Sequence, residues 1–243
     1  MLTIEGLRSG YGRVPVLHGV NLQVEPGEIV AVLGHNGSGK TTMLKTLMGI
    51  VPATSGRIIF RGADVTRMPT ADRSRRGLGY VPQGREIFPK LTVEENLRLG
   101  IVMHAENRRR EENVLEELLA EFSLLRPLLG RQGGVLSGGE QQILAIARCL
   151  GGNPKLMLLD EPTEGIQPSI IEAIVEILKS LVARRMLTVV LVEQKLDFIA
   201  ALASRVHLIQ RGELTTGFSA DQIGSHSVMQ EFAGLGPQPY PPL

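Results

Sequence analysis

The sequence predicts an α/β fold with a mostly parallel sheet, an antiparallel β portion at the start of the chain and a helical insert in the middle. Three apolar runs, residues 155–160, 187–194 and 206–212, alternate with helical segments, and this alternation builds parallel sheets. Residues 2–34 instead alternate short β-type runs with Gly, Pro and Asn, which is typical of antiparallel strands. Residues 84–132 are charged, helical and without strand signals, which indicates the insert.

The individual elements follow in chain order. Residues 29–33 are predicted to form one buried strand after the antiparallel strands, and residues 55–62 extend the β-rich portion. Residues 169–185 show helical periodicity with one apolar face, formed by Ile170, Ile174, Ile177, Leu178 and Leu181.

The length of the chain, 243 residues, suits one large domain or one domain with an inserted subdomain. The composition, 43% apolar and 21% charged, is that of an ordinary globular protein with a proper core. We expect a single domain over residues 1–243, in which core segments 1–83 and 151–225 flank a helical subdomain at about 84–150.

Charge and cysteine content exclude several classes of protein. The net charge is +1, so there is no electrostatic reason to expect a nucleic-acid partner. The single cysteine, Cys149, excludes a disulfide framework within the chain and fits a reducing compartment. The sequence begins without a signal-peptide pattern, and no apolar run approaches the roughly 20 residues of a membrane span. These features predict a soluble cytoplasmic protein.

A phosphate-binding loop is predicted at residues 34–42, GHNGSGKTT, which fit G-x-x-x-x-G-K-[ST] between strand 29–33 and an apolar helix. Its glycines let backbone N–H groups point at phosphate oxygens. Lys40 is expected to reach the β- and γ-phosphates, and the Thr41 hydroxyl to hold Mg²⁺. The alternative, a glycine-rich turn with a chance lysine, is disfavoured by the flanking strand and helix. The expected ATP-binding residues of the loop are Gly34, His35, Asn36, Gly37, Ser38, Gly39, Lys40, Thr41 and Thr42.

A second group of expected site residues follows the apolar run 155–160. Asp160 ends this run, which places a carboxylate at the edge of the sheet beside the phosphate loop, where it suits Mg²⁺ binding. Glu161 follows directly and can poise a water for in-line attack on the γ-phosphate, as general base or as orienter. The alternative for this acidic pair is simple solvation.

A second anion site is indicated at residues 135–147, VLSGGEQQILAIA, where Ser137, Gly138 and Gly139 open a predicted helix. A hydroxyl, glycine amides and a helix N-terminus together make an anion clamp without a fixed positive charge. The alternative is a capped helix in which the glycines serve packing.

With the phosphate loop before it and LLDEPT after it, LSGGEQQ (136–142) resembles the ATPase subunits of ABC transporters, and the resemblance covers residues 2 to about 217. It implies a P-loop NTPase (RecA-like) core that binds ATP and Mg²⁺ and hydrolyses ATP. It also implies a head-to-tail dimer, in which Ser137, Gly138 and Gly139 close on the γ-phosphate held by the partner's phosphate loop.

The same resemblance assigns roles to single positions. Tyr11 matches the aromatic that stacks on adenine, although a half-buried turn tyrosine is the alternative. Gln83 matches the glutamine that touches Mg²⁺ or the attacking water and moves with the helical insert. Gln194 stands where most of the family has a histidine, so it can donate a neutral hydrogen bond but cannot become cationic. Glu161 therefore remains the main catalytic candidate. Residues 164–168, EGIQP, match a dimer-interface loop but carry Gln167 where an aspartate is frequent.

Residues 191–197 and the segment after Gln83 are similar to importer ATPases for branched-chain amino acids and for urea, with VPQGREIF and DEPTEGIQPSII closer to the urea type. This similarity implies two membrane permease subunits, a second ABC ATPase subunit, identical or different, and a periplasmic solute-binding protein. It places the chain peripherally at the cytoplasmic face of the inner membrane, without nucleic acid as a partner. The alternatives are a soluble ABC ATPase acting on nucleic acid or ribosomes and a P-loop kinase.

The segment 84–97 is expected to contact the membrane subunits. It follows Gln83 and shows Ile87, Phe88 and Leu91 around a proline, an apolar cluster where a loop would have solvated residues. The alternative is a small satellite core beneath the helical insert.

Overall fold

The computed structural model describes residues 1–102, 108–215, 217–219 and 222. The end of the predicted second core segment, residues 223–225, lies outside the described residues. No helix in the described ranges is long and apolar enough to cross a membrane.

The start of the chain forms an antiparallel sheet, as the sequence predicted. Its strands, in the spatial order β2-β1-β4-β5, are β1 (Leu2–Tyr11), β2 (Val14–Val24), β4 (Ala53–Phe60) and β5 (Ala63–Asp64). β1 is the centre of this sheet, since it pairs with β2 on one side and with β4 on the other.

A second sheet has a parallel core in the order β9-β3-β8-β7-β6. Its strands are β3 (Ile29–Leu33), β6 (Leu78–Val81), β7 (Leu156–Asp160), β8 (Thr188–Glu193) and β9 (Arg205–Gln210). The short strands β10 (Glu213–Leu214) and β11 (Phe218–Ser219) pair antiparallel with β9. The apolar runs predicted as strands are confirmed, whereas β6 was not predicted, because its four residues are too few to show a period.

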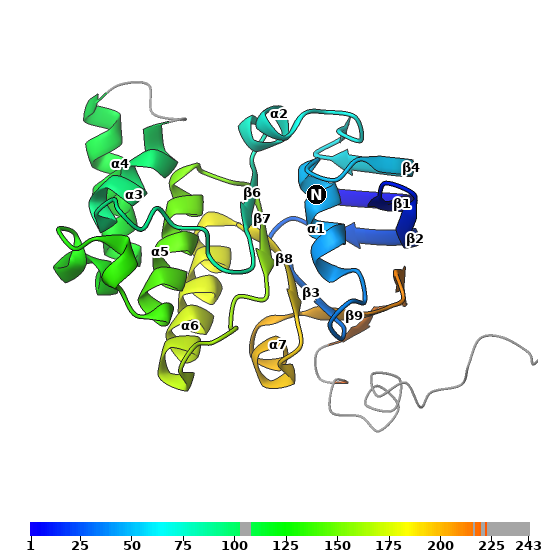
Figure 1. Ribbon diagram of the computed structural model, residues 1–243. Helices are drawn as coiled ribbons and strands as arrows, with labels where there is room; N and C mark the ends of the chain where they lie inside the picture. The colour runs from blue at the N-terminus through cyan, green and yellow to red at the C-terminus, as the bar shows by residue number, and fades with distance from the viewer. Residues whose placement is uncertain (103–107, 216, 220–221, 223–243) are drawn as a thin grey trace, which may run out of the picture.

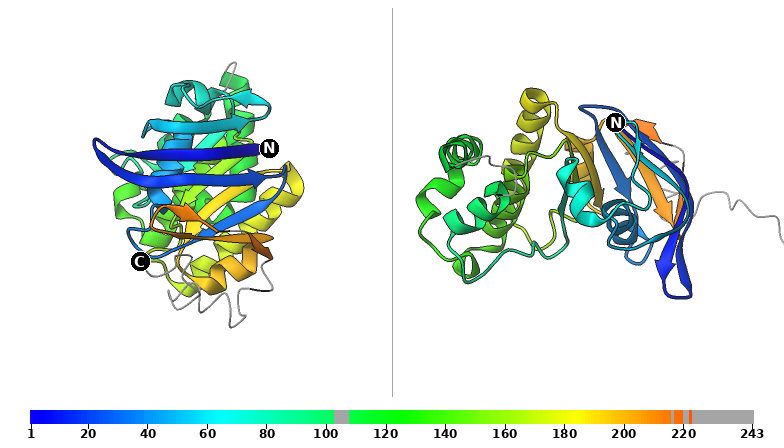
Figure 2. Two further views of the ribbon diagram at one scale, coloured as in Figure 1. Left: turned by 90° about the vertical axis from the view of Figure 1, so that its right-hand side faces the viewer. Right: turned by 90° about the horizontal axis from the view of Figure 1, so that it is seen from above.

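The helices lie in two groups on either side of the parallel sheet (Figures 1 and 2). α1 stands between the two sheets, α5, α6 and α7 cover the opposite face of the parallel sheet, and α3 and α4 pack against the outer side of α5. The helices are α1 (Lys40–Met48), α2 (Thr70–Arg75), α3 (Val93–Val102), α4 (Arg108–Glu121), α5 (Gly138–Gly151), α6 (Pro168–Arg185) and α7 (Leu196–Leu202), with 3-10 turns η1 (Ser123–Leu128) and η2 (Gly133–Val135).

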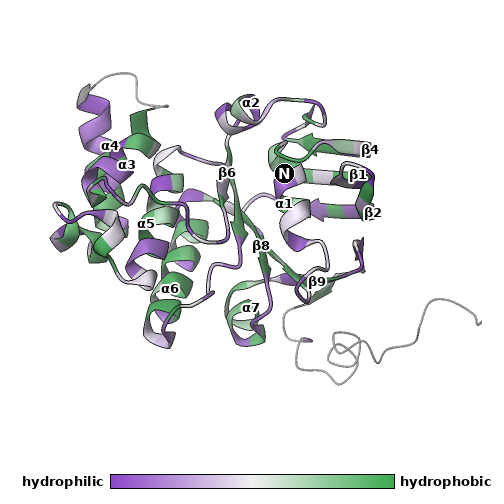
Figure 3. Ribbon diagram, viewed as in Figure 1, coloured by the Kyte–Doolittle hydropathy of each residue, from purple (hydrophilic) through white to green (hydrophobic). Residues whose placement is uncertain are grey.

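The parallel strands are buried on both faces, so they divide the core into two layers. Alternate residues of β3 take opposite sides: Ala31 packs with the α5–α6 layer, and Val30 and Val32 pack with α1 and the antiparallel sheet. Figure 3 shows these central strands mostly in the green of hydrophobic residues, while much of α4 is purple and hydrophilic.

This strand order positions the candidate site. β3, β8 and β7 are neighbours and parallel, so their carboxyl ends meet at one edge of the sheet. β3 leads into the phosphate loop, β8 into Gln194 and β7 into Glu161. Segments more than a hundred residues apart in the chain therefore meet at a single place, where ligands of parallel sheets bind.

Candidate functional site

The phosphate loop wraps the start of α1 and lines a cavity of about 320 Å³. Gly39 immediately precedes α1 with φ 110°, a left-handed conformation that glycine adopts without strain. A Cβ on Gly39 would lie 3.2 Å from Leu17 Cδ2, so the loop also lies against β2. The cavity is lined by Val16, Asn36, Gly37, Gly39, Lys40, Thr41, Thr42, Gln83 and Glu161.

The first turn of α1 suits an anion. It has no acidic residue and no side-chain cap, so its first N–H groups have no side-chain partner. The Ser38 hydroxyl in the same loop is buried and has no hydrogen-bond partner. Phosphate oxygens would accept from these donors, and the residues present therefore fit a nucleotide phosphate.

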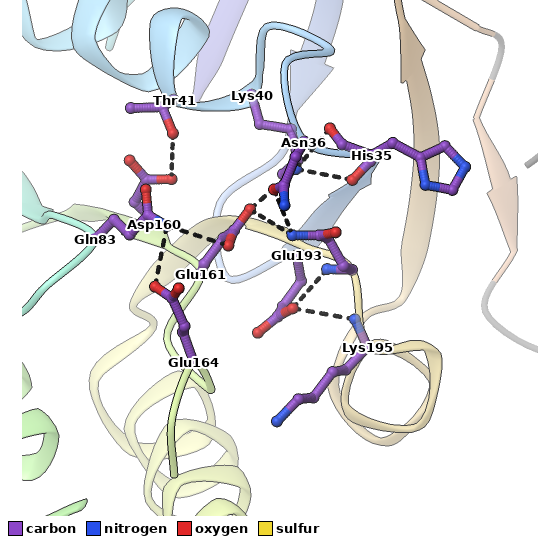
Figure 4. Close-up of polar contacts among 12 residues, drawn as sticks. His35, Asn36, Lys40, Thr41, Gln83, Asp160, Glu161, Glu164, Glu193 and Lys195 are labelled. Atoms are coloured by element: carbon purple, nitrogen blue, oxygen red, sulfur yellow. Dashed lines mark hydrogen bonds and ion pairs between the residues drawn. The ribbon is translucent and has the colours of Figure 1, made fainter. Parts of the chain in front are cut away.

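Lys40 is buried, with 4% exposure, and its ammonium points back into the loop (Figure 4). Nζ donates to the carbonyl oxygens of Gly34 at 2.8 Å and His35 at 3.0 Å, and lies 3.0 Å from Glu161 Oε1. A buried ammonium is stable only with such partners. The P-loop cation and the predicted catalytic carboxylate are therefore in direct contact.

Asp160 is held by side chains from two elements. Thr41 Oγ1 donates to Oδ1 and the Tyr80 hydroxyl donates to Oδ2, both at 3.0 Å. Burial raises the pKa of Asp160 above its usual value, because desolvation disfavours the carboxylate, and the two hydrogen bonds oppose this shift. A cation at this carboxylate would favour its charged form.

Mg²⁺ is a suitable cation for this position. Within the described residues there is no group of three or more His, Cys, Asp or Glu side chains that would make an all-protein metal cage. Mg²⁺ typically uses one or two carboxylates and completes its shell with phosphates and water. Asp160 with the Thr41 hydroxyl is such a partial set.

Glu161 is the meeting point of the site (Figure 4). Besides Lys40, its carboxylate accepts from Gln194 Nε2 at 3.0 Å and from Gln83 Nε2 at 3.4 Å. Its backbone φ of 46° is uncommon for a non-glycine residue, and such strain persists only where the surroundings hold it. The structure thus brings together Lys40, Glu161, Gln83 and Gln194, which come from four separate segments of the sequence, and their roles toward ATP stay predictions.

Gln83 and Gln194 approach Glu161 from different sides. Gln83 Nε2 also donates to Glu164 Oε2 at 3.0 Å, and Gln194 Nε2 also donates to Asn36 Oδ1 at 2.8 Å. Gln194 therefore links the catalytic carboxylate to the phosphate loop with one amide group.

Gln194→Ala should lower ATP turnover roughly 2- to 13-fold, because one neutral hydrogen bond contributes about 0.5–1.5 kcal/mol. The measurement is steady-state ATPase activity, with Gln194→Glu as a companion that replaces the amide with an acceptor. A loss as deep as that expected for Glu161→Gln would instead assign the main chemistry to the glutamine.

Ser137, Gly138 and Gly139 do not line the cavity of their own phosphate loop. Ser137 is the N-cap of α5 and forms a capping box with Glu140. A Cβ on Gly139 would lie 2.8 Å from Ile170 Cγ2, so this glycine is also required for packing against α6. The capping and packing roles of the alternative interpretation are present, and binding to a partner's nucleotide stays a prediction.

Tyr11 does not line the cavity either. It is 51% exposed at the end of β1, opposite Val14 on β2. Val16, which sequence analysis did not single out, lines the cavity from β2. Adenine stacking on Tyr11 stays a prediction.

Arg85 is a second residue that the sequence did not reveal. Its guanidinium donates to the Glu164 carbonyl at 3.1 Å and to the Gln141 side chain at 3.4 Å. A Cβ on Gly138 would lie 3.0 Å from its Nη2, so a cation lies beside the start of α5, where the sequence predicted an anion clamp without a fixed positive charge. Arg85 (φ 71°) and Glu86 (φ 45°) both have left-handed backbones, so the segment after Gln83 is strained.

A separate groove of about 510 Å³ lies between the end of α1, α2, and the α3–α5 layer. Phe88 borders it with 48% exposure, and the Arg148 guanidinium lies 5.1 Å from the ring centroid. Arg148 Nη1 is buried without a hydrogen-bond partner. Ile87 packs against the core and Leu91 is half-buried, so the apolar cluster expected to be exposed is reduced to Phe88.

Comparisons with known proteins point to one family. Residues 17–164 match the family model described as ABC transporter. The high-affinity branched-chain amino acid transport ATP-binding protein BraG of Pseudomonas aeruginosa is 39% identical over 88% of this chain and 91% of its own. The lipopolysaccharide export system ATP-binding protein LptB of Escherichia coli (strain K12) is 37% identical over 88% of each chain.

Solved structures resemble the whole fold. A dimeric post-hydrolysis state of an ATP-binding cassette bound to ADP and Pi has a TM-score of 0.81 at 26% identity, covering 90% of this chain and 99% of that chain. That structure contains a bound nucleotide, and the phosphate loop of this chain predicts a nucleotide site.

Proposed function

The chain belongs to the ABC transporter family as an ATP-binding, ATP-hydrolysing subunit, and on this premise we propose that it powers uptake of urea or branched-chain amino acids through partner membrane subunits. The observation that carries the proposal is the meeting of Lys40, Glu161 and Gln194 at one sheet edge, in a chain similar to a transport ATPase. The urea type is favoured by the residues around Gln83 and by EGIQP, while a relative is named for branched-chain amino acids.

In the proposed mechanism, the phosphate loop binds the ATP phosphates through backbone N–H groups and Lys40. Mg²⁺ would be held by Thr41 and Asp160, with Gln83 beside them, and would supply positive charge to the phosphates. Glu161 orients the attacking water or accepts its proton, and Gln194 positions the γ-phosphate by its amide. The contact between Lys40 and Glu161 supports this assignment, since the group that binds phosphate lies beside the group that would act on water.

The proposed working unit is a dimer with two nucleotides between its subunits. Subunits of this family dimerise and work with membrane permeases. Ser137, Gly138 and Gly139 lie away from their own phosphate-loop cavity, which supports binding of the partner's γ-phosphate rather than their own. The partner is a second ABC ATPase subunit, identical or different, and a periplasmic solute-binding protein delivers the solute.

The proposed domain organisation is a single ATPase domain with a helical subdomain at about 84–150. α3, α4 and α5 lie together at one side of the molecule (Figure 1). The groove beside Phe88 lies between this subdomain and the core, so we propose that it receives a cytoplasmic helix of a permease and holds the chain at the cytoplasmic face of the membrane. Closure of the dimer then moves the helix.

Phe88→Glu should reduce co-purification with the permeases and solute uptake together, while the basal ATPase activity of the isolated subunit survives. The reason is that Phe88 is half-exposed, so a charge at this position disturbs contact with a partner more than packing in the core. Leu124→Glu, at another exposed apolar residue, serves as the control. Misfolding or precipitation of the isolated Phe88→Glu subunit would show that Phe88 belongs to the core.

The solute is tested by uptake of labelled urea and labelled leucine in a strain that lacks this gene. Loss of urea uptake alone supports the urea type, and loss of leucine uptake alone supports the amino-acid type. Normal uptake of both, combined with a defect in the outer surface of the cell, would contradict the importer and favour an export system, as LptB is named.

A further inference from the structure

Glu193 is a buried carboxylate that the mechanism above does not use. It ends β8, directly before Gln194, and is only 3% exposed. In the described parts of the chain, no lysine or arginine forms an ion pair with it within 4.0 Å. A buried charge of this kind is stable only where hydrogen-bond donors replace its water.

The donors come from two loops, one for each carboxylate oxygen. Oε1 accepts from the backbone N–H of Thr163 at 3.2 Å and from the Thr163 hydroxyl. Oε2 accepts from the backbone N–H groups of Gln194 at 2.5 Å and Lys195 at 3.1 Å. Lys195 Nζ also donates to the Thr163 carbonyl at 3.0 Å, so the two loops are bonded to each other directly as well as through Glu193.

The two loops carry the groups expected to act on ATP. Thr163 lies two residues after Glu161, and the backbone N–H of Glu161 donates to the Val192 carbonyl at 3.0 Å. The Gln194 side chain adds a further link between the two loops, because its Nε2 donates to the Glu161 carboxylate at 3.0 Å. Moving either loop against the other would break a bond of Glu193 or the contact between Glu161 and Gln194.

We propose that Glu193 is a positioning residue for ATP hydrolysis, which fixes the distance between Glu161 and Gln194 by binding the loop of each with one oxygen. The proposal deepens the site assigned above and rests on its identification as the hydrolytic site. Glu193 does not touch the reacting atoms; it acts through Gln194 and through the loop that follows Glu161. The Gln194 amide carries no positive charge that would attract it to phosphate, so its placement depends on its neighbours.

The test is ATPase kinetics of the full chain with Glu193→Gln. An amide has one acceptor oxygen, so it can serve only one of the two loops. Because hydrogen bonds to a charged group are worth a factor of roughly 10 to 100, kcat should fall by about tenfold or more, with KM for ATP changed less than about threefold. Glu28→Gln, at the opposite end of the sheet, is the matched control: it removes a carboxylate paired with Arg205 and should lower the melting temperature without this loss of kcat.

A double-mutant cycle distinguishes positioning from mere stability. In a Gln194→Ala background, Glu193→Gln should cost less than in the wild type, since contacts that act through one another are not additive. Thr163→Val tests the same link without touching the carboxylate, and should lower kcat in the same direction even where Glu193→Gln does not fold. Losses that multiply in the cycle, or a kcat that follows only the melting temperature, would overturn the proposal.

The outcome is separable from that of the transport proposal. Suppose that Glu193→Gln lowers kcat as expected, but that loss of the gene leaves urea and leucine uptake normal. This result would contradict the importer and leave the positioning role intact. Normal kinetics of both Glu193→Gln and Thr163→Val, in a chain required for uptake, would contradict the positioning role alone.

Discussion

Glu161→Gln should lower ATP turnover by at least about 100-fold, the usual scale for loss of an acid–base group, while ATP affinity stays near normal. The carboxylate lies 3.0 Å from Lys40 Nζ and accepts from Gln194 Nε2 at 3.0 Å. A glutamine oxygen can accept from both of these donors, so the substitution keeps these two contacts and gives up only the longer one from Gln83. It removes the basic oxygen that would take a proton from water.

The measurements are kcat in the assembled transporter and ATP affinity of the isolated subunit. With binding intact and hydrolysis blocked, the dimer should accumulate in its closed form, visible as an ATP-dependent dimer by size-exclusion chromatography. Glu172→Gln, an exposed carboxylate on α6, is the control and should behave as the wild type. Hydrolysis by Glu161→Gln at the wild-type rate would falsify the assignment.

One intact site should survive when a Lys40→Ala subunit is paired with a Gly139→Asp subunit, although each variant alone is inactive. In a head-to-tail dimer each site combines the phosphate loop of one subunit with Ser137–Gly139 of the other. The mixed dimer therefore contains one site with both defects and one site with neither. An aspartate at position 139 obstructs backbone approach to phosphate and repels it.

The packing of Gly139 requires a specific control. Since a side chain at this position would meet Ile170 in its own subunit, Gly139→Asp is made together with Ile170→Ala, and Ile170→Ala alone is measured beside it. Roughly half of the wild-type activity per dimer is expected if the two sites are independent. Inactivity of the mixed dimer, with ATP binding lost in the isolated Gly139→Asp subunit, would mean that this segment acts within its own chain.

The parts of the site that could be predicted from the sequence are those that lie in short, recognisable sequence patterns. The phosphate loop, Asp160 and Glu161 each follow an apolar run, and a parallel strand buried on both faces is easily recognised by such a run. Gln83 lacked this support, because β6 was too short to be recognised as the strand before it.

The parts that the sequence did not predict are contacts between distant segments. Glu193 in LVEQ has the appearance of an ordinary strand end, and only the neighbouring loop of Thr163 shows what its carboxylate binds. Arg85 has a left-handed backbone conformation, which its residue type does not indicate. Its place beside Gly138 depends on how α5 packs, which is a tertiary property.

The hydrogen bond from Tyr80 to Asp160 has a consequence for spectroscopy. The chain contains no tryptophan and three tyrosines, so its near-ultraviolet absorption and emission come almost entirely from phenol rings. Burial raises the pKa of Tyr80, so the ring is a neutral phenol that donates a hydrogen bond to the Asp160 carboxylate. The unlabelled protein thus contains a natural chromophore at one hydrogen bond from Asp160, and changes at that carboxylate can be followed optically without an attached dye.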